Sequence, residues 1–245
     1  MSVCTVCDRG ILSARCAIHL ARVRLTGVGL DGSATGREEG LLDRSGCMSP
    51  MSGNEDFPLP DDLPEPEDDG SADHVSGMTV PSVALTATNG TVVDLSERTG
   101  RTVVYCYPKT GRPDKDVLPD GWNAIRGARG CTPEACSFRD HYQDFQERGV
   151  TEVYGLSVQS PAYQREVRNR LHLPFQLLSD EDREFASRLD LPTFEVAGER
   201  LLKRLTLVLN EGRVEYVFYP VFPPDEHATE VLRWLETSPP AGHSE

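Results

Sequence analysis

Short apolar runs separated by turn residues mark the C-terminal two thirds of the chain. Two β-rich runs, 83–86 and 91–93, flank Asn89-Gly90, a dipeptide that favours a tight hairpin turn. Residues 102–107 form a longer β-rich run that stops at Pro108. The pattern therefore predicts an antiparallel hairpin followed by a buried strand.

Apolar residues at helical spacing predict the helices. Segments 135–145 and 163–171 repeat apolar residues every three or four positions. Ser179 with Asp182 has the form of a capping box, which predicts a short third helix. Asp225 predicts the N-terminal cap of a last helix.

Three further strands complete the pattern. Residues 152–158 predict one, and 204–209 and 214–219 predict two more, joined by a turn at 210–213. Strands that alternate with helices and end in an antiparallel hairpin are typical of an α/β fold with a mixed central sheet flanked by helices. A thioredoxin-like fold fits this order. Ligands of such sheets bind beyond the carboxyl ends of the strands, where we expect the loop 108–130.

Composition and charge exclude several classes of function. The net charge of the 245-residue chain is −14, without a basic patch, so we expect no nucleic-acid partner. No stretch approaches the roughly 20 apolar residues of a membrane span, so we expect no membrane partner. The seven cysteines are irregularly spaced, and we see no secretory signal. We therefore expect a reducing cytoplasm, where such cysteines are catalytic, redox-sensing or metal-binding.

The first third of the chain differs in composition. Residues 1–50 are rich in Gly, Ser and Arg, and we expect a disordered leader that the mature protein can lack. Residues 51–76 are acidic and proline-rich, which predicts an extended segment because little apolar surface is available to offset the entropy of ordering. We expect the globular domain to span residues 77–240.

Four residues of the leader have a spacing that resembles zinc ligands. The interval between the two pairs is short, and nothing around it has the pattern of a zinc knuckle or ribbon. A metal site there is the weaker hypothesis, and a leader without a metal is the stronger one. The residues are Cys4, Cys7, Cys16 and His19.

Cys131 stands at the start of a predicted helix. Thr132 suits an N-cap, and Pro133 suits the first helical position, where its missing N–H costs nothing. Glu134 in the first turn complements the helix dipole. Unpaired backbone N–H groups and the dipole favour the thiolate over the thiol, so we predict a lowered pKa for Cys131. The alternative is a buried structural cysteine that packs as a small apolar residue.

Cys136 follows five residues after Cys131. Residues five apart in a helix are separated by about 7.5 Å of rise, whereas a disulfide needs Cα atoms within about 7 Å. The two cysteines can therefore bond only if the first helical turn unwinds. Such a pair would be a redox switch at a helix end.

Residues 130–140, Gly-Cys-Thr-Pro-Glu-Ala-Cys-Ser-Phe-Arg-Asp, resemble the signature of the bacterioferritin-comigratory, or Q-type, peroxiredoxins. These belong to the alkyl hydroperoxide reductase and thiol-specific antioxidant family. Their pattern runs Tyr-Pro-x-x-x-Thr-Pro-Gly-Cys-Thr-x-Glu-x-Cys-x-Phe-Arg-Asp. The resemblance covers about residues 77–238 and includes 104–108 and 202–209.

The resemblance implies a role for individual residues. Cys131 matches the peroxidatic cysteine, which attacks the peroxide and becomes a sulfenic acid. Cys136 matches the resolving cysteine, which condenses with it to a disulfide. Arg204 matches the arginine that contacts the peroxidatic sulfur, although a surface arginine in an ordinary ion pair is the alternative. Pro108 matches the proline that shields the pocket.

The same resemblance implies a thiol-dependent peroxidase for hydrogen peroxide and organic hydroperoxides. Thioredoxin or a glutaredoxin would regenerate the dithiol, and no cofactor, neither metal, flavin nor haem, is required. We expect a monomer or weak dimer. A thiol–disulfide oxidoreductase and a non-catalytic redox sensor are alternatives on the same fold, but oxidoreductases usually carry Cys-x-x-Cys.

An insert separates this sequence from the family pattern. Residues 112–128 lie between the proline and the cysteine, and Ala128 occupies the position of the family threonine. Thr110 is the first candidate to supply the missing hydroxyl, and Thr132 is the second. Trp122, within the insert, is expected either to cover the pocket or to pack against the surface.

Overall fold

The computed structural model describes residues 59–60, 62–112 and 118–238. The predicted leader and its four zinc-type residues lie outside the described residues, as do the first residues of the acidic segment. Within the described part of the chain, every helix is too short or too polar to span a membrane.

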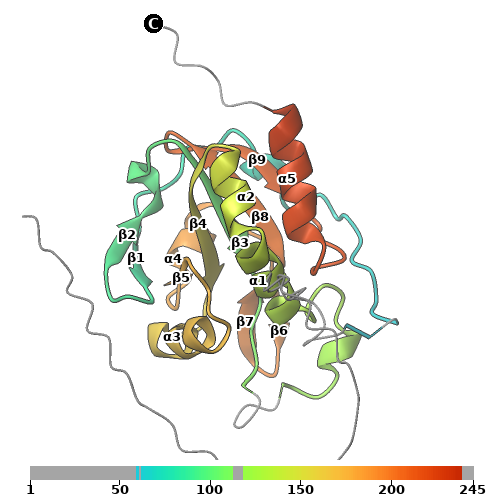
Figure 1. Cartoon of the computed structure of the whole chain (residues 1–245). Helices are drawn as coiled ribbons and strands as arrows, with labels where there is room; N and C mark the ends of the chain where they lie inside the picture. The colour runs from blue at the N-terminus through green and yellow to red at the C-terminus, as the bar shows by residue number, and fades with distance from the viewer. Residues whose placement is uncertain (1–58, 61, 113–117, 239–245) are drawn as a thin grey trace, which may run out of the picture. The chain divides into compact units, whose positions relative to one another are not determined.

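A seven-stranded mixed sheet forms the centre of the fold (Figure 1). Strand β3 lies between β4, which is parallel to it, and β8, which is antiparallel. In spatial order the strands are β2 (Val92–Asp94), β1 (Ala84–Ala87), β5 (Gln176–Ser179), β4 (Val150–Ser157), β3 (Arg101–Cys106), β8 (Leu205–Asn210) and β9 (Arg213–Phe218).

Helices cover both faces of this sheet. Helices α1, α2 and α5 cover one face (Figure 1), and α3 contributes Val167 to the same core. Helix α4 contributes Phe185 to the core on the opposite face. The helices are α1 (Cys131–Asp140), α2 (Tyr142–Glu147), α3 (Pro161–Arg170), α4 (Glu184–Arg188) and α5 (His227–Thr237), with short 3-10 turns η1 (Asp73–Val75), η2 (Leu95–Glu97) and η3 (Trp122–Ala124).

Strand β3 is buried along its whole length because alternate side chains enter the two cores. Val103 and Tyr105 enter the core beneath α1, and Val104 and Cys106 enter the opposite one. The predicted α/β fold with a mixed sheet is confirmed, and the carboxyl end of β3 points the following loop toward the start of α1.

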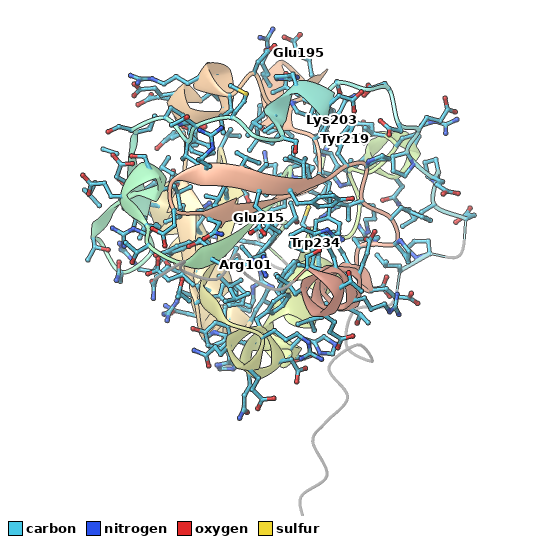
Figure 2. All side chains as sticks on the ribbon, turned by 90° about the horizontal axis from the view of Figure 1, so that it is seen from above. Arg101, Glu195, Lys203, Glu215, Tyr219 and Trp234 are labelled. Carbon is cyan, nitrogen blue, oxygen red and sulfur yellow. The ribbon has the colours of Figure 1, made fainter. Side chains whose placement is uncertain are left out.

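Arg101 connects the C-terminal end of α5 to the sheet (Figure 2). The Arg101 side chain is almost fully buried, and its guanidinium pairs with Glu215 of β9. It also donates to the Ser238 carbonyl over 2.7 Å and lies 5.4 Å from the centroid of the Trp234 ring. This cluster holds the C-terminal end of α5 against β9.

Several predicted boundaries are wrong in detail. The helix predicted over 135–145 is two helices that meet at His141. The capping box is not formed: Asp180 accepts hydrogen bonds from two backbone N–H groups of α4, at 3.0 and 2.9 Å. Glu226, not Asp225, precedes α5.

Two elements were not predicted. Strand β5 lies between β1 and β4 in the sheet, and a separate hairpin pairs β6 (Thr193–Val196) with β7 (Glu199–Leu202). In the acidic segment, Ala72 and Val75 are buried, so its last residues rest on the fold. The domain start at residue 77 stays a prediction.

Candidate active site

Helix α1 begins at Cys131 itself. Gly130 precedes it with a φ of +104°, a left-handed conformation that glycine adopts without strain. A Cβ atom on Gly130 would collide with the Pro224 side chain. The predicted N-cap at Thr132 is therefore wrong, because the left-handed turn at Gly130 starts the helix one residue before Thr132.

Arg204 connects Cys131 with Glu134. This arginine, just before β8, is 3% exposed. Its Nη2 donates to the Cys131 Sγ over 3.2 Å and to the Arg129 carbonyl over 3.1 Å, and its Nη1 pairs with a Glu134 carboxylate oxygen. The structure thus places the Arg204 guanidinium in contact with the Cys131 sulfur. The alternative, a surface arginine in an ordinary ion pair, does not fit, because Arg204 is buried.

Glu134 is the buried ion-pair partner of Arg204 and does not lie at an exposed helix end. Its side chain is fully buried. Burial raises the pKa of the Glu134 carboxyl to about 7, against the opposing effect of the Arg204 charge. The sequence indicated only that Glu134 complements the helix dipole, because its partner lies 70 residues away.

The predicted fall in the pKa of Cys131 is wrong for this arrangement. Burial raises the pKa of the thiol, and the Glu134 carboxylate raises it further. The Arg204 guanidinium and the backbone N–H of Lys109 act in the opposite direction. These two groups are therefore the ones that stabilise a thiolate at this site.

Thr110 and Pro108 lie in the loop that follows β3. The Thr110 hydroxyl donates to Gln159 Oε1 over 3.0 Å, so the structure gives it a partner other than the sulfur. The Pro108 carbonyl accepts a 3.4 Å hydrogen bond from Ser157. Thr132 is half-buried in the first turn of α1. The roles of the two threonines and of Pro108 stay predictions.

Gln159 is a residue that the sequence did not single out. Its Oε1 accepts from the Thr110 backbone N–H, also over 3.0 Å, and its Nε2 donates to the Thr110 carbonyl over 3.1 Å. Together with the hydroxyl bond, these contacts fix Thr110 at three atoms. They therefore fix the loop whose Lys109 N–H interacts with the Cys131 sulfur.

Cys136 lies in the same helix as Cys131 and is buried in the core beneath it. Cys106 is also buried, in β3, and burial raises the pKa of its thiol far above the usual range. None of the three described cysteines forms a disulfide. The predicted disulfide between Cys131 and Cys136 is therefore not present in this form of the protein.

The described part of the insert packs against the β6–β7 hairpin. Trp122 is 4% exposed and clusters with Ala128 and Leu201. Its ring centroid lies 6.2 Å from that of Phe194. Trp122 thus packs against the surface that the β6–β7 hairpin offers and is itself buried there, and a role in covering the pocket stays a prediction.

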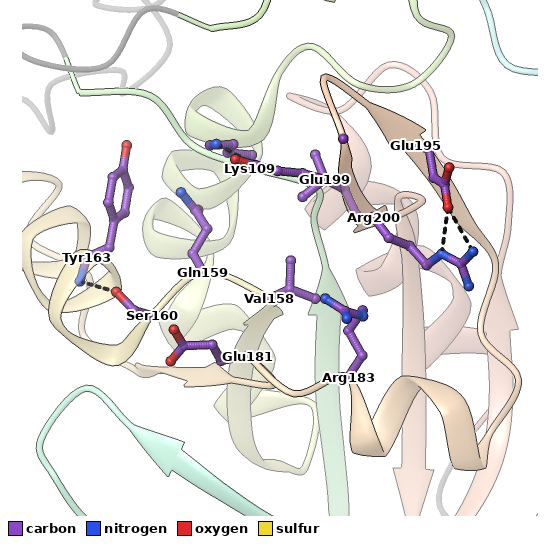
Figure 3. A pocket seen from close by; sticks show the side chains of 12 residues that line it. Lys109, Val158, Gln159, Ser160, Tyr163, Glu181, Arg183, Glu195, Glu199 and Arg200 are labelled. Atoms are coloured by element: carbon purple, nitrogen blue, oxygen red, sulfur yellow. Dashed lines mark hydrogen bonds and ion pairs between the residues drawn. The ribbon is translucent and has the colours of Figure 1, made fainter.

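Lys109 also lines a large cleft (Figure 3). Its volume is about 700 Å³. Charged side chains of both signs line it, and Lys109 pairs with Glu199 over 2.8 Å. Figure 3 shows Arg200 turned toward Glu195, with which it pairs on the hairpin.

Residues 75–232 match the family model named Redoxin. The chain belongs to the redoxin family. Within it the chain is a Q-type peroxiredoxin: chloroplastic peroxiredoxin Q of Oryza sativa subsp. japonica is 34% identical over 163 residues, which are 66% of each chain. Chloroplastic peroxiredoxin Q of Populus jackii is 32% identical over 66% of this chain and 68% of its own length. This peroxiredoxin thus spans about two thirds of the length of these relatives.

A solved structure supports the same family. Peroxidoxin BcpB of Mycobacterium tuberculosis superimposes with a TM-score of 0.54 at 27% identity, over 66% of this peroxiredoxin and 97% of that protein. The C47S mutant of Xylella fastidiosa PrxQ, at 23% identity, also has a TM-score of 0.54 and shows the fold alone.

The names of the relatives correct one expectation. The similar plant proteins are chloroplastic. The prediction of a cytoplasmic location for this peroxiredoxin is therefore contradicted. That prediction depended on the absence of a secretory signal, an observation that does not separate the cytoplasm from other reducing compartments.

Proposed function

We propose that this peroxiredoxin is a thiol-dependent peroxidase with Cys131 as its nucleophile. The observation that carries the proposal is the 3.2 Å contact between Arg204 Nη2 and the Cys131 Sγ inside a buried site. A fixed cation beside a sulfur stabilises the thiolate, which is the form of cysteine that attacks peroxides.

This geometry supports the following reaction. The Cys131 thiolate attacks one peroxide oxygen, and the O–O bond breaks. The other oxygen leaves with a proton as water or an alcohol, and the sulfur becomes a sulfenic acid. Arg204 donates to the oxygens as charge develops on the leaving one. The peroxide is reduced by two electrons and the sulfur is oxidised by two.

Cys136 completes the cycle in this proposal. After the first turn of α1 unwinds, the Cys136 thiol attacks the sulfenic sulfur, a disulfide forms and water leaves. A dithiol reductant of the thioredoxin or glutaredoxin type then restores both thiols by exchange. The protein is expected to act as a monomer or weak dimer, and Pro108 with Thr110 or Thr132 would shape the peroxide pocket.

The test is peroxide consumption coupled to thioredoxin, thioredoxin reductase and NADPH. We expect sustained turnover that Cys131→Ser abolishes. Cys136→Ser should allow one turnover and then stop, because the sulfenic acid has no partner. Cys106→Ser is the matched control, because this buried thiol packs in the core on the other face of the sheet from Cys131 and Cys136. Sustained turnover by Cys131→Ser would refute the proposal.

A further inference from the structure

Part of the acidic segment lies across the loop that leads into α1. We call the described residues of the range 59–71 the strap. A Cβ atom on Gly130 would lie 3.4 Å from the Leu59 side chain, and a Cβ atom on Gly127 would lie 3.7 Å from Pro66. The strap therefore packs against the loop at two points directly before the first turn of α1.

The strap leaves little free space beside Arg204. Leu63 and Pro64 of the strap line one cavity together with Arg204, and the volume of this cavity is about 10 Å³. That is about the room that a single water molecule needs. Because protein atoms fill the rest of this region, residues 127–130 can move toward the strap only after the strap has moved away.

Two exposed anchors hold the strap in place. Asp69 accepts hydrogen bonds from Lys203 over 2.6 Å and from the Tyr219 hydroxyl over 2.8 Å, and Lys203 and Tyr219 lie side by side in Figure 2. Arg126, in the insert, pairs with Glu67 over 3.0 Å. Exposed ion pairs contribute little to stability. The strap can therefore detach as a local event while the rest of the domain stays folded.

We propose that the strap controls the unwinding of the first turn of α1, which brings Cys136 to Cys131. The inference rests on the proposed function, in which this turn opens before the disulfide forms. While the strap is in place, its contacts keep residues 127–130 and the start of the helix folded. When the strap detaches, these contacts are lost and the turn unwinds more often. The strap precedes the part of the chain that the family resemblance covers, so this control is a property of the acidic segment.

The test measures alkylation of Cys136 by iodoacetamide in the full chain carrying Cys131→Ser. Cys136 is 1% exposed, so its alkylation rate follows the population of the form in which the helix start is open. Asp69→Asn should raise this rate about fivefold, because the loss of an exposed ion pair changes an equilibrium by up to about that factor. Asp62→Asn is the matched control: Asp62 is an exposed acid of the same strap and makes no ion pair within the described part of the chain.

Cys106 separates local opening from unfolding of the whole domain. It is buried in the core on the other face of the sheet, so its alkylation in the same samples reports global unfolding. A faster reaction of Cys136 alone supports the inference. An unchanged rate in Asp69→Asn, an equal rise in Asp62→Asn, or an equal rise at Cys106 overturns it. Arg126→Met removes the other anchor and should act in the same direction, so it decides the matter if Asp69→Asn does not fold.

Treatment with peroxide separates this inference from the proposed function. After one equivalent of hydrogen peroxide, Asp69→Asn with all cysteines intact should form the disulfide about fivefold faster than the wild type. If the wild type consumes no peroxide, the proposed function fails, and the alkylation rates still decide the inference. If the wild type is a peroxidase but both anchor variants form the disulfide at the wild-type rate, the inference is overturned and the proposed function stands.

Discussion

Replacing Arg204 with methionine tests the electrostatics of the site. Two unit charges at the observed 3.2 Å interact by about 5 kcal/mol at an effective dielectric constant of 20. That is an upper limit of nearly four pKa units, at about 1.4 kcal/mol each. The guanidinium charge is delocalised and shared with Glu134, so we expect a rise of about 2 units in the Cys131 pKa.

The assay measures the rate of Cys131 alkylation by iodoacetamide as a function of pH. Mass spectrometry of the peptide that contains Cys131 excludes the other cysteines, and a Cys136→Ser background prevents disulfide formation. A pKa rise of about 2 units lowers the thiolate fraction at neutral pH about a hundredfold. The rate at pH 7 should fall by the same factor, and peroxide reduction with it.

Arg200→Met is the matched control for this prediction. Arg200 lies on the neighbouring hairpin, with its side chain 58% exposed, and its ion pair with Glu195 contributes little. The pH midpoint of alkylation should not change in this variant. A midpoint for Arg204→Met within half a unit of the wild type, in a protein that is still folded, would refute the electrostatic argument.

Three further predictions concern stability and positioning. Burial raises the Glu134 pKa from 4.5 to about 7, so between these pH values the folded protein binds more protons than the unfolded chain, and its stability falls as pH rises. Glu134→Gln should remove this fall in the free energy of unfolding, measured with urea from pH 4.5 to 7.5. A pH dependence that persists in the variant would contradict the assignment. Asp180→Ala should lower the free energy of unfolding by about 1–2 kcal/mol, because two N–H groups of α4 lose their acceptor; an unchanged urea midpoint would show that water replaces the carboxylate. Gln159→Leu removes three hydrogen bonds to Thr110 and should raise the pH midpoint of Cys131 alkylation, whereas a change in melting temperature alone would indicate a purely structural role.

The parts of the fold that depend on local pattern were predictable. The Asn89-Gly90 hairpin and the buried strand β3 are present because turn chemistry and β-rich runs act over a few residues. Strand β5 was missed because its four residues are too few to show a period. The break between α1 and α2 at His141 was missed because apolar spacing continues across it.

The active site, too, was predictable only where it depends on neighbouring residues in the sequence or on the family resemblance. The start of a helix beside Cys131 was predictable from the sequence, and the resemblance implied the contact of Arg204 with the sulfur. The pairing of Cys131 with Cys136 stays a prediction. The burial of Glu134 and the three contacts of Gln159 depend on segments brought together by the sheet. The pKa of Cys131 was predicted in the wrong direction, because a helix terminus was visible in the sequence and its burial was not.

The burial of Cys136 in the core links the thermal stability of the protein to the rate at which Cys136 can react. Cys136 is buried with Phe138 and Phe145 beneath α1, so in the proposed cycle each turnover opens part of that core. A variant with tighter packing there would resist heat better but would release Cys136 more slowly. Its sulfenic acid would then persist long enough to meet a second peroxide and oxidise irreversibly. In the proposed cycle, the packing around Cys136 thus sets the peroxide concentration that the protein can survive.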